Sequence, residues 1–163
     1  MSDIDDPDEL EQEKLDLMNP NRVNRDNFLN AISQVESSGG QNTNHPVVQG
    51  GIQDGQQAIG SYGLMPNTIQ ELSNRARLNN TLTPDMAAAS RDPASVKTNP
   101  ALAQQYANQL ADKVLNKFPD QNMAAYAWNH GHNLSPQEVQ DRDYMNDPYV
   151  QKFQKVRRSL GFK

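Results

Sequence analysis

The stretch NRDNFLNAISQVESSGG, residues 24–40, is the part of the sequence that most decides the fold. Apolar residues recur in it at intervals of three and four; they are Phe28, Leu29, Ile32 and Val35. This spacing places them on one face of a helix, and the paired glycines that follow favour its termination. We therefore predict the first core helix over residues 24–37, with Glu36 at its end.

Residues 38–65 follow with neither a helical nor an alternating pattern. This segment contains most of the glycines of the chain, namely Gly39, Gly40, Gly50, Gly51, Gly55, Gly60 and Gly63. Irregular loops of this length are uncommon in a compact domain unless they build a functional site. We expect a long glycine-rich loop that forms a cleft.

The rest of the sequence predicts helices, because residues that cap or begin helices recur along it. The expected helices are 68–77 after Asn67, a short one from Thr83-Pro84, one from Asn99-Pro100 to Phe118, one from Pro119 to Gly131, and two that begin at Ser135-Pro136 and Asp147-Pro148. No internal repeat is present in the sequence. The fold class is therefore expected to be mainly α.

Charge divides the chain into an arm and a body. The first sixteen residues hold eight acidic residues and one lysine, a charge of −7, which leaves +2 for the rest of a chain whose net charge is −5. We predict an acidic, disordered or weakly helical arm over residues 1–20 and one folded domain over residues 21–163. The mildly basic body favours approach to an anionic polymer. Nucleic acid is not expected as a partner, since basic helix faces are usually only solvated.

Composition and hydropathy exclude several chemistries. The chain has no cysteine, which removes disulfides, thiolate zinc sites and thiol nucleophiles. No apolar stretch approaches the roughly 18 residues of a membrane span. The acidic start also lacks the basic and then apolar pattern of a signal peptide. We expect no membrane span and no signal peptide, so that work outside the cytoplasm requires another means of delivery.

Glu36 is the candidate for acid–base chemistry. A carboxyl at the end of an apolar helix, beside a glycine-rich loop, is partly removed from water. Such removal raises the pKa of the carboxyl and lets it donate a proton near neutral pH. The same position also suits an ordinary surface glutamate, and position alone leaves both interpretations open.

Three motifs occur in one order: VES at residues 35–37, AIGSYGLMPNT at residues 58–68 and AAYAWNHG at residues 124–131. They resemble the glutamate-serine pair, the Ala-x-Gly-Leu-Met-Gln-Ile-Met-Pro-x-Thr stretch and the Ala-Tyr-Asn-x-Gly motif of the lytic transglycosylases, the soluble-lytic-transglycosylase-like branch of the lysozyme superfamily. The resemblance spans roughly residues 28–131. It implies a lysozyme-like helical domain in which the long glycine-rich loop forms the substrate cleft.

The second motif departs from the family pattern. Without a gap, Gly60 keeps the family glycine, while Ser61, Tyr62 and Gly63 replace Leu-Met-Gln. An alternative alignment on residues 63–65 loses the Gln-Ile-Met piece. We favour the ungapped alignment, because it retains the proline and the threonine at the start of the next helix.

The resemblance implies an enzyme that cleaves the bond between N-acetylmuramic acid and N-acetylglucosamine in peptidoglycan, with no cofactor and no metal. Glu36 protonates the glycosidic oxygen and then takes a proton from the muramyl carbon-six hydroxyl, which attacks the anomeric carbon to give a 1,6-anhydro product. No second carboxylate is required, because the substrate supplies the nucleophile. The substrate-binding residues implied in the same way are Ser37, Gly60, Ser61, Tyr62, Gly63, Tyr126 and Asn129. Ser37 is expected to support either the loop or the substrate.

The roles of the two tyrosines have alternatives. By the resemblance, Tyr126 reaches Glu36 or the sugar beside it, whereas its apolar surroundings also suit a core residue. In the third motif two residues separate Tyr126 from Asn129, which makes the role of Asn129 less direct. Tyr62, a tyrosine among glycines, suits a sugar-stacking platform or a plug that holds the loop on the domain.

The three histidines and Asp54 are further candidates for a site. The spacing of His45, His130 and His132 does not match a metal site, so we expect them to bond the loop backbone or line the cleft. Asp54 is the candidate for a second carboxylate that would permit hydrolysis. Its alternative is an ordinary turn residue before a glycine.

The expected partner is the glycan strand of bacterial peptidoglycan. An enzyme of the cell wall without a signal peptide suggests delivery by a phage particle, a lysis system or a secretion system, and thus a virion-associated protein or one delivered to the wall or periplasm. The acidic arm is then a candidate contact with other virion proteins. The alternative functions are a hydrolytic muramidase and a non-catalytic structural virion protein that retains the fold.

Overall fold

The structure is a computed structural model that describes residues 20–50 and 53–161. The predicted acidic arm, residues 1–20, lies outside the described residues apart from Pro20. The helices are α2 (Pro20–Ser37), α3 (Pro66–Leu78), α4 (Pro84–Arg91), η1 (Pro93–Thr98), α5 (Pro100–Lys117), α6 (Gln121–His130), α7 (Pro136–Asp141), η2 (Tyr144–Asn146) and α8 (Pro148–Ser159). No strand is assigned in the described residues, and the prediction of a mainly α fold is confirmed.

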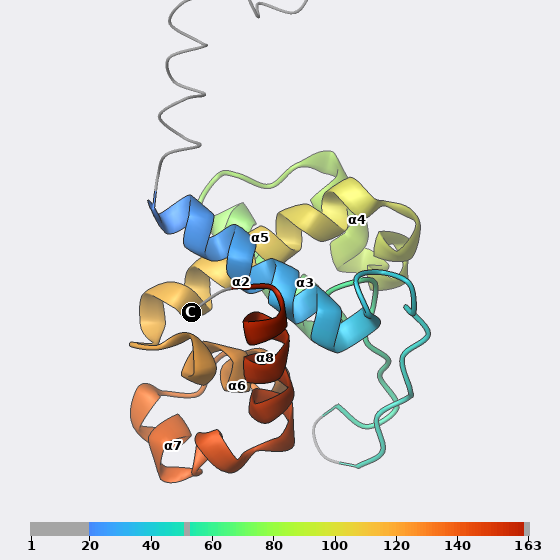
Figure 1. Cartoon of the computed structure of the whole chain (residues 1–163). Coiled ribbons are helices and arrows are strands. Elements are labelled where there is room, and N and C mark those ends of the chain that lie inside the picture. Colours follow the sequence, from blue (N-terminus) through green and yellow to red (C-terminus); the bar gives the residue numbers. More distant parts are fainter. Residues whose placement is uncertain (1–19, 51–52, 162–163) are drawn as a thin grey trace, which may run out of the picture.

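Helix α2 lies at the centre of the packing. It contacts α5 and α8, and α6 in turn packs on α5 and α8. Figure 1 shows α2 running diagonally across the molecule, with α8 beneath its C-terminal half. The buried ring of Phe28 on α2 lies 5.8 Å from that of Trp128 on α6 and 5.5 Å from that of Phe153 on α8. One aromatic side chain thus joins the helix that carries Glu36 to the last helix of the domain.

The predicted first helix is correct in its end and begins earlier than expected. The prediction started at residue 24, whereas α2 begins at Pro20. Proline is tolerated in the first turn of a helix, where its missing N–H has no partner to lose. The predicted core residues of this helix, Phe28, Leu29, Ile32 and Val35, are all buried.

Four predicted helix starts are confirmed by their capping hydrogen bonds. The side chain of Thr83 accepts from the backbone of α4, that of Asn99 from α5, that of Ser135 from α7 and that of Asp147 from α8. Ser135 also forms a complete capping box with Glu138. Two 3-10 helices, η1 and η2, were not predicted.

Two predicted helix starts are each wrong by two residues. Asn67 does not cap α3, because the helix begins at Pro66 and the cap position is Met65, which makes no side-chain capping bond. Pro119 does not begin α6 either. Asp120 is its cap, with the Asp120 side chain accepting from the backbone N–H of Met123 at 2.9 Å.

The described part of residues 38–65 is an irregular loop, as predicted (Figure 1, cyan). Its paired segments are two isolated antiparallel bridges, Val47 with Gln57 and Ile59 with Leu64. The second bridge closes a tight turn over residues 60–63, with backbone hydrogen bonds of 2.7 and 3.0 Å between Ile59 and Leu64. The loop therefore returns to α2 and leads directly into α3.

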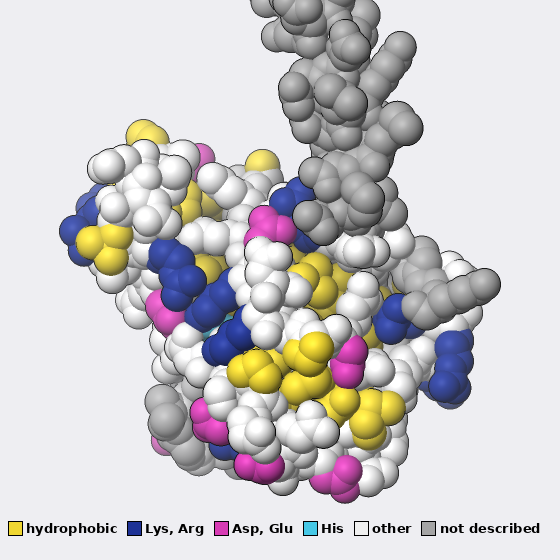
Figure 2. Space-filling model, turned by 90° about the vertical axis from the view of Figure 1, so that its left-hand side faces the viewer, with side chains coloured by type: hydrophobic (Ala, Val, Ile, Leu, Met, Phe, Trp, Pro, Cys, Tyr) yellow, Lys and Arg dark blue, Asp and Glu magenta, His cyan; other side chains and the backbone are white. Residues whose placement is uncertain are grey.

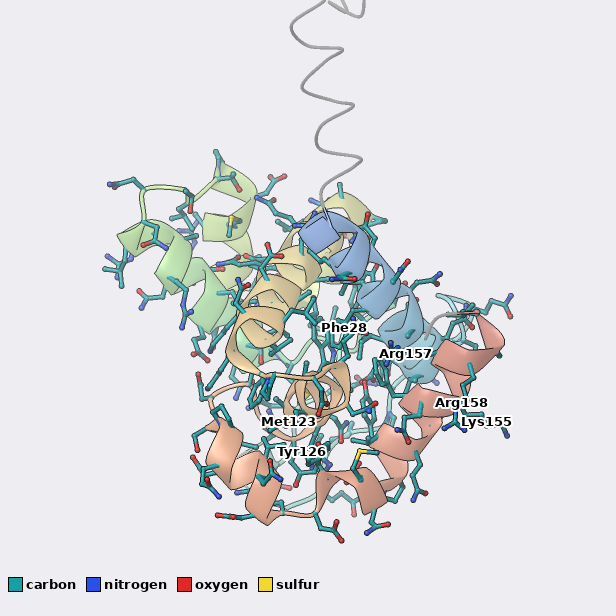
Figure 3. The ribbon with its side chains drawn as sticks, turned by 60° about the vertical axis from the view of Figure 1, so that its left-hand side comes forward. Phe28, Met123, Tyr126, Lys155, Arg157 and Arg158 are labelled. Carbon is teal, nitrogen blue, oxygen red and sulfur yellow. The ribbon has the colours of Figure 1, made fainter. Side chains whose placement is uncertain are left out.

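Lysine and arginine side chains are spread over several helices. Figure 2 shows a row of them next to a group of hydrophobic side chains on one face. Figure 3 shows Phe28 and Tyr126 inside the domain, whereas Lys155 and Arg158 project from α8.

The helices of the described residues include none with the length and apolar character needed to cross a membrane.

Candidate active site around Glu36

Glu36 lies in the last turn of α2 and is half-buried. Its Oε1 accepts a hydrogen bond of 2.7 Å from the hydroxyl of Tyr149, a residue of the first turn of α8. On the other side, the carboxyl lies against the backbone of Gly63. A Cβ at Gly63 would be only 2.7 Å from Glu36 Cδ, and the φ of 63° there is also unfavourable for other residues. The glycine is therefore what lets the loop close over this carboxyl.

Burial raises the pKa of Glu36, and this effect outweighs the opposing ones. The hydrogen bond from Tyr149 and the positive charges of His45 and Lys152 lower it, because each favours the carboxylate. A carboxyl whose pKa is raised holds its proton to higher pH and can donate it to a leaving oxygen. The structure therefore places the Glu36 carboxyl in a partly desolvated environment rather than that of a fully solvated glutamate.

Tyr149 is the neighbour of Glu36 that the sequence interpretation missed. The sequence predicts Tyr149 only as a residue at the start of a helix, and it is 113 residues away from Glu36 in the chain. Burial and the nearby Glu36 charge raise the pKa of the Tyr149 hydroxyl well above its ordinary value. The phenol therefore stays protonated and remains a donor to the carboxylate. The sequence shows only that Tyr149 lies two residues after the capping residue Asp147, and this does not indicate which residue its side chain contacts.

Ser37 supports the loop. Its side chain is 2% exposed, and its hydroxyl lies 2.7 Å from the carbonyl oxygen of Ser61 and 3.0 Å from that of Ser33. The hydroxyl oxygen of Ser37 also accepts a hydrogen bond from the backbone N–H of Gly40 at 2.9 Å. Of the two roles predicted for Ser37, loop support or substrate contact, these bonds correspond to the first.

Three consecutive carbonyl groups of the turn 60–63 are held by side chains from other segments. His45 Nε2 lies 2.7 Å from the Gly60 oxygen, and Ser37 lies against the Ser61 oxygen. Trp128 Nε1 donates to the Tyr62 oxygen at 3.0 Å. Partly buried carbonyls without partners cost stability, so these three donors help to fix the turn beside Glu36. The predicted role of His45, bonding to the loop backbone, agrees with this arrangement.

Two cavities contain most of the other predicted residues. Gly60, Ser61 and Tyr62 line a cavity of about 590 Å³ together with Lys97 and Gln104. The Tyr62 hydroxyl donates to Gln104 Oε1 at 2.6 Å, so this ring is tied to α5 at the edge of the cavity. Glu36 does not itself line the cavity. Its contact with Gly63 places the carboxyl one residue further along the same turn.

Asn129 lines a second, more open cavity of about 830 Å³, with Glu71, His130 and Arg142 among its other residues. Tyr126, predicted to reach Glu36 or the sugar, is 7% exposed, and its ring stacks on that of His130 at 4.2 Å. The hydroxyl that donates to Glu36 belongs to Tyr149 instead. The structure thus brings Ser37 and the turn 60–63 to Glu36, and places Asn129 at the second cavity and Tyr126 against His130.

The remaining candidates have partners of their own. Asp54 accepts from the backbone N–H of Gly50 at 2.7 Å, within its own loop. His132 is buried between Lys113 and Glu71, and burial together with the Lys113 charge lowers its pKa to about 4. His130 lies 2.8 Å from Asp147. Within the described residues, His, Asp and Glu side chains form no group suited to a metal ion.

No family model matches the chain, and neither the curated proteins nor the solved structures contain a match to it.

Proposed function

We propose that this protein is a peptidoglycan lytic transglycosylase with a lysozyme-like helical domain, and that Glu36 is its general acid and base. The observation that carries the proposal is the state of Glu36: a half-buried carboxyl with a raised pKa, hydrogen-bonded by Tyr149 and placed against the turn that leads to a cavity. The three sequence motifs supply the chemistry that this geometry suits.

In the reaction, protonated Glu36 gives its proton to the glycosidic oxygen between N-acetylmuramic acid and N-acetylglucosamine as that bond breaks. The resulting carboxylate then takes the proton of the muramyl carbon-six hydroxyl, whose oxygen bonds to the anomeric carbon. The products are a 1,6-anhydromuramyl end and a free sugar hydroxyl, and Glu36 is protonated again. Tyr149, His45 and Lys152 stabilise the carboxylate between the two steps, since each favours the charged form.

A one-carboxylate mechanism is supported by the charges around Glu36. The charged groups that perturb its pKa are His45 and Lys152, and both are basic. Asp54, the predicted candidate for a second carboxylate, is exposed and bonded within its loop. Ordinary glycoside hydrolysis uses a pair of carboxylates, whereas an attack by the substrate's own hydroxyl needs one. The arrangement therefore favours transglycosylation over hydrolysis.

The proposed partner is the glycan strand, held along the turn 60–63 and the cavity beside it. Tyr62 offers an aromatic face and Gln104 an amide, which suit the apolar faces and hydroxyls of sugars. Binding would order the strand over Glu36 and remove water from it. Delivery to the wall by a phage particle or a secretion system, with the acidic arm as a contact to other virion proteins, remains part of this proposal.

Digestion of purified peptidoglycan tests the proposal. We expect wild-type protein to release fragments with anhydro ends, which borohydride does not reduce and which mass spectrometry finds lighter by one water than hydrolytic fragments. Glu36→Gln should be inactive and Asp54→Asn fully active, which makes the second variant the matched control. Reducible ends would establish the hydrolytic muramidase instead. Equal activity of wild type and Glu36→Gln would remove Glu36 from the catalysis, and activity in neither would leave the structural virion protein.

A further inference from the structure

A chain of contacts links α6 to Glu36 through the start of α8. The ring of Tyr126 stacks on His130, the last residue of α6, and His130 Nε2 lies 2.8 Å from Asp147 Oδ2. The other oxygen of Asp147 accepts from the backbone N–H of Tyr149 at 2.9 Å. The Tyr149 hydroxyl then donates to Glu36 at 2.7 Å. Each step of this path is a direct contact.

The two carboxylate oxygens of Asp147 have different hydrogen-bond partners. Oδ1 caps α8 by accepting from the N–H groups of Tyr149 and Val150, which would otherwise lack partners at a helix start. Oδ2 bonds His130 and so ties that cap to the C-terminal end of α6. Because Tyr149 is the second residue of α8, its direction depends on how this first turn sits. The contact of His130 with Asp147 is therefore a direct link between this first turn and the end of α6.

We propose that His130 and Asp147 are positioning residues that hold the Tyr149 hydroxyl on Glu36. Neither of them bonds the carboxyl itself, and His130 acts through Asp147 and the first turn of α8. The catalytic consequence rests on the function proposed above. The effect on the titration of Glu36 does not, because it requires only the contacts of the folded protein.

Other contacts also anchor α8. Val150, in the first turn, and Phe153 are fully buried, and Lys152 Nζ donates to the carbonyl oxygen of Val35 at 3.3 Å. These contacts hold the body of the helix on α2. Helix ends fray when their caps are lost, so the body can stay in place while Tyr149 moves. The pair can therefore be broken without unfolding the domain.

Two substitutions of His130 separate its hydrogen bond from its ring stacking. His130→Phe keeps an aromatic ring on Tyr126 and removes the Nε2 donor, whereas His130→Gln keeps a donor of similar reach and removes the ring. We expect His130→Phe to raise the pKa of Glu36 in the same direction as Tyr149→Phe, since both weaken the hydrogen bond to the carboxylate. His130→Gln should leave that pKa near the wild-type value. The Glu36 carboxyl is followed by carbon-detected NMR over a pH series of the full chain.

The double variant decides between positioning and general destabilisation. In a Tyr149→Phe background no hydroxyl remains to be positioned, so adding His130→Phe should shift the Glu36 pKa no further. On peptidoglycan, His130→Phe should lower kcat about tenfold with little change in KM. His130→Gln should keep kcat near the wild-type value. Thr83→Ala, which removes a comparable cap from α4, is the matched control and should lower stability without moving the Glu36 pKa.

Additive shifts of the Glu36 pKa in the double variant, or an unchanged pKa in His130→Phe, would overturn the positioning role. If instead the expected pKa pattern is found and wild-type protein does not cleave peptidoglycan, the positioning role stands and the proposed function fails.

Discussion

Gly63→Ala is the substitution that tests the geometry around Glu36 most directly. An alanine at φ 63° costs about 1–2 kcal/mol from the left-handed backbone alone. Its Cβ would also lie 2.7 Å from Glu36 Cδ and 3.2 Å from Cγ, so the side chain must rotate away. Rotation breaks the bond to Tyr149, and hydrogen bonds to charged groups contribute roughly 1.5–3 kcal/mol. We expect a total loss of about 2.5–5 kcal/mol in the free energy of unfolding.

Gly60→Ala is the matched control. Its φ of 75° carries a similar backbone cost, but a Cβ there meets nothing within 4 Å. Urea unfolding should therefore give a loss of about 1–2 kcal/mol for Gly60→Ala, and the difference between the two variants measures the displaced carboxyl. Cleavage of peptidoglycan should fall about a hundredfold in Gly63→Ala, because a displaced acid cannot transfer its proton. Equal stability losses and equal rates in the two variants would refute the close contact of Gly63 with Glu36.

Three further predictions concern stability. Ser37→Ala should lower the free energy of unfolding by about 1–3 kcal/mol in urea, because the partly buried carbonyl of Ser61 and the N–H of Gly40 lose their partner; an unchanged midpoint would remove Ser37 from the support of the loop. Glu36→Gln should become more stable than wild type as pH rises above the ordinary carboxyl pKa of 4.5, since the raised pKa of Glu36 means that ionising it costs stability, and should match wild type in acid; thermal melts over pH show this, and a parallel pair of profiles would contradict it. His132→Gln should lose less stability than wild type as pH falls from 6.5 towards 4, because the lowered pKa of His132 makes the unfolded chain bind the proton first; the same melts test it, and an equal acid loss in both proteins would contradict it.

Features that depend on neighbours in the chain could be predicted from the sequence. The caps at Thr83, Asn99, Ser135 and Asp147 act on N–H groups two or three residues away, so residue type and order identify them. The buried face of α2 follows from its spacing for the same reason. The partial burial of Glu36 was expected from its place at the end of an apolar helix beside a glycine-rich loop, although the groups that cover it come from distant parts of the chain.

The errors at helix starts also have a local cause. Asn67 is a good capping residue by type, but Pro66 precedes it and begins α3, because proline fits the first helical position and has no N–H to satisfy. At α6 the order in the chain is the same, Pro119 followed by Asp120, but there the capping residue supplies the cap and the helix begins after it. When a proline is followed by a capping residue, the sequence allows two starts that lie two residues apart.

The partner of Glu36 could not be predicted, because it depends on how the last helix lies on the first. Tyr149 has no feature that distinguishes it from a residue of an ordinary helix start, and Tyr126 had the stronger motif. What brings Tyr149 to α2 is the packing of Phe153 on Phe28, together with the cap at Asp147. In the sequence Phe153 is recognisable only as an apolar residue. That it packs on Phe28 depends on the three-dimensional arrangement of the helices.

This dependence on packing has a consequence for the chemistry of Glu36. Burial of the carboxyl raises its pKa, and the hydrogen bond from Tyr149 lowers it, so the two effects oppose each other at the same interface. Both depend on how closely α8 approaches α2. If α8 lay further from α2, water would reach the carboxyl and the hydrogen bond from Tyr149 would be lost. The first change would lower the pKa of Glu36 and the second would raise it, so the pKa would change little, but the carboxyl would no longer be held in place. The fixed orientation of Glu36, more than its pKa, is therefore what the packing of α8 secures.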